Sequence, residues 1–301
     1  MGTDMSTDIM KNRNLKEEVQ EQIKKAGKSF RKLNHKFDSD AIHDFRVEIK
    51  KIRAMLRLAG FAINQKDGMK IPKKLKSFYR TVGNIRSLQL HEKKIGDTVN
   101  NERDPSPDFY LRLLEGRKAV NIRRAKKKKR QLRGIKKEME KLIRRLPKGI
   151  DAISARNFME YELGRLKEIQ SKEFPADAEF HEARKIMKDI FYNWAFIGPG
   201  PRTILPASIQ KKEKMEGFID RLGDYHDEAV SLEMFNDFPI DQSADSREQF
   251  EKIAGKWHEE KRQLHDKVMA SMKAISMNGK RRRASPATRP KTRPIGSLKK
   301  Q

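Results

Sequence analysis

The sequence predicts an all-α protein, built as two four-helix bundles that are related by internal duplication and enclose a basic central cavity. Nearly every long segment repeats its apolar residues at the helical period, and none alternates like a strand. Eight such segments divide four and four around Gly149. A row of basic residues also occurs twice, at nearly one separation along the chain.

The connections between the expected helices contain proline, glycine and aspartate, which interrupt helices. Because short connections favour antiparallel neighbours, each set of four helices is expected to form a bundle. The expected domains are a first bundle at 1–150, a second bundle at 151–278 and a tail at 279–301. The expected helices lie near residues 13–34, 40–62, 71–98, 107–146, 154–172, 177–196, 206–235 and 246–276.

The composition indicates a polyanionic partner. The 301 residues include 69 Lys+Arg and 42 Asp+Glu, so the net charge is +27, and this excess repels itself in a compact state. The absence of cysteine excludes disulfides, cysteine nucleophiles and thiolate metal sites. No apolar run approaches the roughly 20 residues of a membrane span, and the N-terminus lacks the apolar core of a secretory signal. A cytoplasmic protein without a membrane partner is therefore expected.

The composition changes from Gly279 onward. This stretch holds nine Lys/Arg, three prolines and no acid, and it cannot bury enough apolar surface to order itself. A disordered basic tail is therefore expected. It either binds an anionic surface or serves only solubility.

The stretch at 41–58 predicts a helix with a basic edge. At about 100° per residue its basic residues fall within roughly 80° of arc, beside an apolar arc of similar width. One interpretation is that these cations merely flank an apolar stripe and extend to water. The basic row consists of His43, Arg46, Lys50, Arg53 and Arg57.

The same spacing recurs 138 residues later. His181, Arg184 and Lys188 repeat the positions of the first three members of the row, again beside apolar residues. A second repeated feature follows each row: Gly83 and Gly223 are 140 residues apart and lie in similar sequence surroundings. Two features that recur at nearly one offset indicate a duplicated unit.

Two facing rows of this kind suit a linear phosphate polymer. Steps of three to four residues place cations about 5 Å apart along a helix. Arginine offers a planar fork to phosphate oxygens, and lysine offers a point charge. A histidine with an ordinary pKa would gain a proton beside such a ligand.

These motifs resemble those of the CHAD domain, the conserved histidine α-helical domain. The first row fits the family pattern His-x-x-Arg-Val-x-x-Lys-x-x-Arg-x-x-x-Arg, and LGDYHD at 222–227 is similar to its Leu-Gly-x-x-x-Asp signature. The second row is similar to the second repeat of the family at His181, Arg184, Lys188 and Tyr192. The resemblance spans roughly residues 10–276. It implies two four-helix bundles around a basic cavity that binds inorganic polyphosphate, lined by the matching residues, and it suggests association with phosphate granules.

The chain departs from the family pattern in three places. Phe191 stands where the first repeat has Arg53, and Asp189 stands where a basic residue is common. Ser87 replaces the aspartate that usually follows Arg86. The second wall is therefore expected to be less positive, and the first bundle to contribute more of the binding energy.

Further basic residues are candidates for the same ligand. The stretch 117–145 holds fifteen Lys/Arg and two acids, which form either a solvated face or an anion contact. Within it, Arg124 and Lys128 are the expected channel residues. Another set shares one face of the third expected helix, where it either extends the basic wall or lies at a solvated rim. This set is Lys73, Lys76 and Arg80.

Other residues are expected to have structural roles. Gly83 and Gly223 favour a close approach between helices, and Arg86 and Asp227 favour a polar clamp between helices. Zinc needs three or four converging ligands, whereas the adjacent His-Asp pairs of this chain point to different helix faces. We therefore expect no metal and no cofactor. No glycine-rich phosphate loop or carboxylate pair for Mg²⁺ accompanies the histidines, so we expect no catalytic residue and no enzyme activity.

The leading hypothesis is a non-catalytic binder of inorganic polyphosphate or another phosphate-rich anion. The alternative is a non-specific nucleic-acid binder that uses 117–145 and the tail. Binding of single strands relies on base stacking against aromatic side chains, yet only 7% of this chain is aromatic and most of these residues lie in apolar stripes. No zinc-finger or RNA-recognition motif is present.

Overall fold

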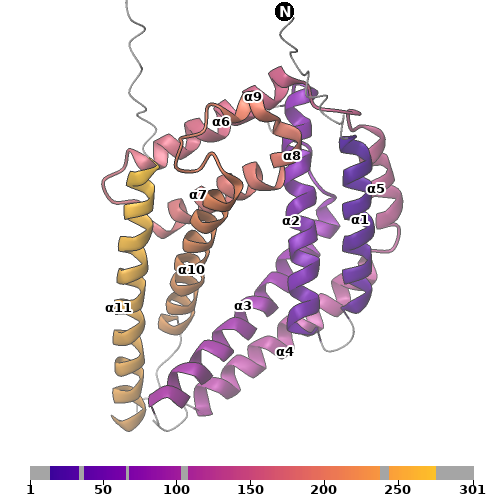
Figure 1. Ribbon diagram of the computed structural model, residues 1–301. Helices are drawn as coiled ribbons and strands as arrows, with labels where there is room; N and C mark the ends of the chain where they lie inside the picture. The colour runs from indigo at the N-terminus through magenta and orange to yellow at the C-terminus, as the bar shows by residue number, and fades with distance from the viewer. Residues whose placement is uncertain (1–13, 34–36, 66–67, 103–107, 238–243, 276–301) are drawn as a thin grey trace, which may run out of the picture.

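The computed structural model describes residues 14–33, 37–65, 68–102, 108–237 and 244–275, and within these ranges the chain is helical without strands (Figure 1). The all-α prediction is therefore confirmed. The expected tail at 279–301 lies outside the described residues. The helices are α1 (Leu15–Lys32), α2 (Ser39–Ala62), α3 (Lys73–Glu102), α4 (Asp108–Gln131), α5 (Ile135–Arg144), α6 (Ala152–Gln170), α7 (Asp177–Tyr192), α8 (Trp194–Ile197), α9 (Pro199–Arg202), α10 (Lys212–Asn236) and α11 (Ala244–Ala274).

Local side chains define where the helices with basic edges begin. Asp38 accepts a hydrogen bond from the backbone N–H of Ala41 at 3.1 Å, which caps α2. At the start of α7 the Glu179 carboxylate accepts the backbone N–H of Ala176 at 2.7 Å. Both contacts satisfy amide groups that a helix start leaves without a partner.

Several helix boundaries differ from the sequence expectation, among them the end of α3, which extends to Glu102. The helix expected at 107–146 is divided into α4 and α5 at Gly134, whose φ of +83° lies in the left-handed region that favours glycine. The expected 177–196 helix ends at Tyr192 and is followed by the short α8 and α9, with Gly198 between them at φ +70°. The last difference is that α10 begins at Lys212 and not near residue 206.

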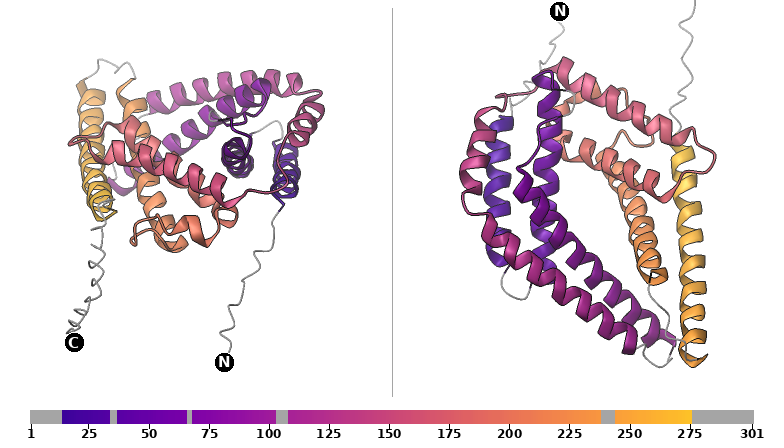
Figure 2. Two further views of the ribbon diagram at one scale, coloured as in Figure 1. Left: turned by 90° about the horizontal axis from the view of Figure 1, so that it is seen from above. Right: turned by 180° about the vertical axis from the view of Figure 1, so that it is seen from behind.

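The two halves of the chain share one apolar core. In the first half α1 packs on α2 and α3 on α4, whereas in the second half α7 packs on α6 and α10, and α10 on α11. Helix α2 also packs on α6 and α7, and the main cluster of buried apolar residues continues across this junction (Figures 1 and 2). The division expected near Gly149 falls in the connection between α5 and α6.

A second apolar cluster joins the halves at a distance from the first. The α3–α4 and α10–α11 hairpins converge toward their far ends, where Tyr110, Phe235 and Trp257 are buried together (Figure 1). The Trp257 indole donates to the Thr98 hydroxyl at 3.2 Å. Lys94 of α3 pairs with Glu228 of α10 and Glu260 of α11. The basic edges of α2 and α7 thus belong to a frame that is closed at both ends.

Across the ranges described above, no helix combines the length and apolar character that a membrane crossing requires.

Candidate functional site

The apolar edges that accompany the two basic rows are buried, as their periodicity predicted. On α2 the buried set is Ile42, Phe45, Ile49, Ile52 and Leu56. On α7 it is Phe180, Ala183, Met187 and Ile190, with Trp194 partly buried beyond them. Because each helix is fixed by this edge, the direction of its neighbouring basic edge is fixed as well.

The first arginine of each row lies against a glycine of the neighbouring helix. A Cβ added to Gly83 of α3 would collide with the Arg46 guanidinium, and one added to Gly223 of α10 would lie 3.0 Å from Arg184 Nη2. Arg46 also donates to the carbonyl of Tyr79 at 3.3 Å and lies 4.7 Å from the centre of its ring. The glycines were expected to admit a neighbouring helix. Their nearest neighbours are instead arginine side chains.

The two rows converge on a shared group of positive charges. Burial lowers the pKa of Lys50 to about 7, with further lowering from Lys188, Arg46 and Arg184. Burial and then Arg184 lower the pKa of Lys188 to about 8, opposed by Asp220 and Asp227. Because Lys188 and Arg184 of α7 lower the pKa of Lys50 on α2, cations of the two helices lie close enough to repel one another. We call Arg46, Lys50, Arg184 and Lys188 the basic cluster.

Three histidines surround the basic cluster. The rings of His181 and His226 are 4.2 Å apart, and burial with nearby positive charge lowers the pKa of each to about 4. The pKa of His43 is also lowered, by partial burial and then by Arg86 and Lys50. His181 and His226 are thus neutral at pH 7 in the free protein. His226 was not among the sequence candidates, because it lies within the LGDYHD stretch, where the motif indicates Asp227.

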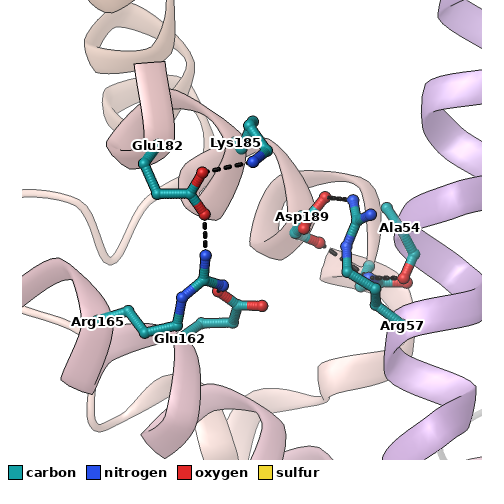
Figure 3. A network of polar contacts seen from close by, with 8 residues as sticks. Ala54, Arg57, Glu162, Arg165, Glu182, Lys185 and Asp189 are labelled. Atoms are coloured by element: carbon teal, nitrogen blue, oxygen red, sulfur yellow. Dashed lines mark hydrogen bonds and ion pairs between the residues drawn. The ribbon is translucent and has the colours of Figure 1, made fainter. Parts of the chain in front are cut away.

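At the other end of the first row, Arg57 is paired with a carboxylate of α7. Arg57 donates to Asp189 of α7 (Figure 3). Asn193 donates to the carbonyl of Ala54 at 2.9 Å. Between these ends, Arg53 lies 5.5 Å from the Tyr79 ring centre. Arg57, expected as a ligand residue, is therefore engaged in an ion pair between the halves. Its partner is Asp189, one of the departures from the family pattern.

Of the six remaining candidates, two are partly buried and four are exposed. Lys128 of α4 donates to the Thr81 hydroxyl of α3 at 2.7 Å. Tyr192 is half-buried, and burial raises its pKa. The other four are exposed, and within the described residues no contact joins them to the basic cluster. They are Lys73, Lys76, Arg80 and Arg124.

An acidic row on α10 was missed by sequence reasoning. Asp220, Asp224 and Asp227 are exposed and follow one another at helical spacing. The pKa of Asp224 is raised by partial burial and by its two aspartate neighbours, and lowered by Arg184. The charge of Asp227, which was expected to clamp helices, acts on Lys50 of α2 and Lys188 of α7. Its neighbours Asp220 and Asp224 belong to no motif, which explains why the sequence did not reveal them.

No group of three or more possible metal ligands occurs in the part of the chain that the structure describes. Two cavities lie elsewhere, one of about 760 Å³ lined by α6 and the 203–208 segment and one of about 590 Å³ between α10 and α11. No member of the basic cluster lines either cavity. The basic cluster is therefore separate from both of these cavities.

Comparison with known proteins supports the fold. No curated protein matches the chain significantly. The solved structure of PptA from Streptomyces chartreusis aligns with a TM-score of 0.60 at 13% identity, covering 86% of this chain and 98% of that one. The crystal structure of the CHAD domain from the plant Ricinus communis aligns with a TM-score of 0.59 at 14% identity, covering 88% and 93%. The model of the CHAD domain family matches residues 18–236, which include both basic rows and both glycines but not α11. This chain therefore belongs to the CHAD domain family.

Proposed function

We propose that this protein binds inorganic polyphosphate without altering it chemically, through the basic cluster between α2 and α7. The observation that most supports the proposal is the lowering of the Lys50 pKa to about 7 and the Lys188 pKa to about 8, partly by neighbouring cations. Such repulsion is unfavourable in the free protein and is relieved when an anion binds. An anionic ligand is thus favoured by the charges already in place.

The form of the site favours a chain of phosphates over a single anion. From His43 to Arg53 the first row extends ten residues, or about 15 Å along α2. The second row runs along α7, and its cations meet those of α2 at Lys50. A linear polymer with one charge on each unit can contact several of these cations at once, and each contact with an arginine can be bidentate.

Stacking of nucleic-acid bases has little support at this site. Tyr79 lies beside Arg46, and its ring is already covered by Arg46 and Arg53. The exposed aromatic side chains Tyr161 and Phe174 lie on α6 and on the segment that follows it. Nucleic acid held by 117–145 and the tail is the alternative, and it would depend mainly on phosphate contacts.

Titration of the full chain with long-chain polyphosphate, and with single- and double-stranded RNA and DNA, at about 150 mM salt tests the proposal. Arg46→Ala and Lys50→Ala should weaken polyphosphate binding. Arg221→Ala, which removes an exposed arginine of α10, is the matched control and should have little effect. A variant that ends at Asn278 should keep its polyphosphate affinity, whereas non-specific nucleic-acid binding should fall with added salt and with loss of the tail.

The proposal fails if Arg46→Ala leaves polyphosphate affinity unchanged while removal of the tail abolishes it. Release of phosphate from polyphosphate in the presence of Mg²⁺ would show instead that the protein is an enzyme.

A further inference from the structure

The first basic row ends at a carboxylate supplied by the other half of the chain. Arg57 donates through Nη2 to Asp189, whose side chain is only 7% exposed. Asn193, one turn beyond Asp189, holds α7 against α2 through the carbonyl of Ala54. The guanidinium of Arg57 thus faces a fixed negative charge, whereas the guanidinium of Arg46 faces a backbone carbonyl and an aromatic ring.

Cationic and acidic side chains alternate around this ion pair, and burial raises the pKa of Glu162 to about 7. Arg165 of α6 donates to Glu162 and to Glu182, and Lys185 of α7 donates to Glu182 (Figure 3). Together with Arg57 and Asp189 this makes three cations and three carboxylates, which we call the ionic network. The basic cluster, by contrast, contains four cations and no carboxylate, and its arginines lower the pKa values of Lys50 and Lys188. The positive potential therefore declines along α2 from Lys50 toward Arg57.

We propose that Asp189 ends the anion-binding track on α2, and that it thereby limits how many phosphate groups of a polyphosphate chain the protein engages. The inference rests on the proposed function. A phosphate placed beside Arg57 would also lie beside the Asp189 carboxylate. Repulsion between these two negative groups disfavours binding of a phosphate at this position.

The spacing of the row along α2 indicates how much longer a ligand could be engaged if Asp189 were uncharged. The open part of the row, from His43 to Arg53, covers about 15 Å, and Arg57 would add about 6 Å, slightly more than one helical turn. Removing the charge of Asp189 should therefore extend the track by one position. A short ligand that already fits within the open part gains nothing from this extension.

Isothermal titration with linear polyphosphates of defined length tests the assignment. Asp189→Asn should raise the affinity for long chains about fivefold and leave the affinity for tripolyphosphate within about twofold of the unchanged protein. Glu182→Gln is the matched control, because it removes one negative charge from the ionic network without touching Arg57. Equal gains for long and short ligands, or equal gains in the two variants, would overturn the assignment in favour of a general charge effect.

A second variant keeps the test decisive if Asp189→Asn does not fold, which a thermal melt followed by circular dichroism would reveal. Because Arg57 is already neutralised, Arg57→Gln should cost long-chain affinity less than threefold, whereas Arg46→Gln should cost about tenfold or more. Equal losses would overturn the assignment. Absence of polyphosphate binding by the unchanged protein would refute the proposed function itself, whereas binding that depends on Arg46 but not on Asp189 would refute only the length limit.

Discussion

The two halves place an arginine against a glycine in the same way, yet they surround it with opposite charges. Three residues before the glycine, and one and four after it, α3 carries Arg80, Asn84 and Ser87. At the same separations from Gly223, α10 carries Asp220, Asp224 and Asp227.

This difference teaches that the backbone frame and the charge of a site can vary separately. The position of each guanidinium depends on the missing side chain of a glycine, which both halves retain. The charge around it depends on exposed positions of the neighbouring helix, which pack against little and can differ between the halves. In the second half the aspartates partly neutralise Arg184 and Lys188. We therefore expect the first half to contribute more of the ligand affinity.

The largest effect on affinity is expected when the first arginine of either row, Arg46 or Arg184, is replaced by alanine. Arg46→Ala should weaken polyphosphate binding by about 2 kcal/mol, or roughly thirtyfold, since it removes charge-assisted hydrogen bonds. Arg184→Ala should cost about 1 kcal/mol, or roughly fivefold, because the nearby Asp224 already offsets part of the Arg184 charge. Titration calorimetry at one salt concentration measures both. Equal losses, or a greater loss for Arg184→Ala, would contradict the asymmetry.

A change of pH should alter affinity and stability in opposite directions. Lys50 and Lys188 have pKa values of about 7 and 8 in the folded protein, and a bound polyanion raises them, so binding takes up protons. Polyphosphate affinity should therefore fall, by about tenfold between pH 7 and 8.5. The unfolded chain has ordinary lysine pKa values near 10.4 and binds more protons in this range, so the free energy of unfolding without ligand should rise.

Lys50→Arg distinguishes the contributions of Lys50 and Lys188 to this pH dependence, since arginine keeps its charge throughout the range. The step near pH 7 should disappear while the step near pH 8 remains. Unchanged pH profiles of affinity and of denaturant unfolding would show that Lys50 does not titrate there.

The two glycines provide a smaller and more selective test. Gly83→Ala should displace the Arg46 guanidinium and weaken binding about fivefold, whereas Gly223→Ala, with the looser contact, should cost about twofold. Alanine is favoured over glycine within a helix by about 1 kcal/mol, so neither variant should lose much stability. Thermal melts alongside the titrations distinguish misplacement of an arginine from unfolding. A Gly83→Ala protein that binds normally would show that the position of Arg46 is unimportant.

The smallest expected effect comes from exchanging charge between the halves. Asp227→Asn should raise polyphosphate affinity about twofold, because an exposed carboxylate acts on Lys50 and Lys188 through solvent. Ser87→Asp, the equivalent position of α3, should lower it by a similar factor. Both effects should shrink when salt is raised from about 50 to 300 mM. Persistence of either effect at high salt would indicate a direct ligand contact.

The sequence predicted the features that depend on helix periodicity. The long helices, their buried edges and the convergence of Lys50 with Lys188 follow from spacing and from the repeat. The division at Gly134 was missed, because a single glycine within a strongly basic helical pattern is compatible with a continuous helix.

Contacts between distant residues that the repeat does not relate could not be predicted. The ion pair of Arg57 with Asp189 joins residues 132 positions apart, and sequence reasoning identified Asp189 only as a missing cation. The contact of Arg46 with Gly83 likewise needs the crossing of α2 and α3. The roles of Lys73, Lys76, Arg80 and Arg124 stay predictions, since their side chains are exposed and no contact in the described residues assigns them.

The two tryptophans of the chain lie in or against different apolar clusters. Trp257 is fully buried in the cluster where the hairpins converge, with Lys94 4.5 Å from its ring centre. Trp194 packs at the edge of the main core beneath Arg202, 4.4 Å from its ring centre. Emission from each indole can therefore be observed alone after replacing the other with phenylalanine. The fluorescence of Trp257 can therefore report on the junction where the hairpins converge, and that of Trp194 on the edge of the main core, when polyphosphate is added.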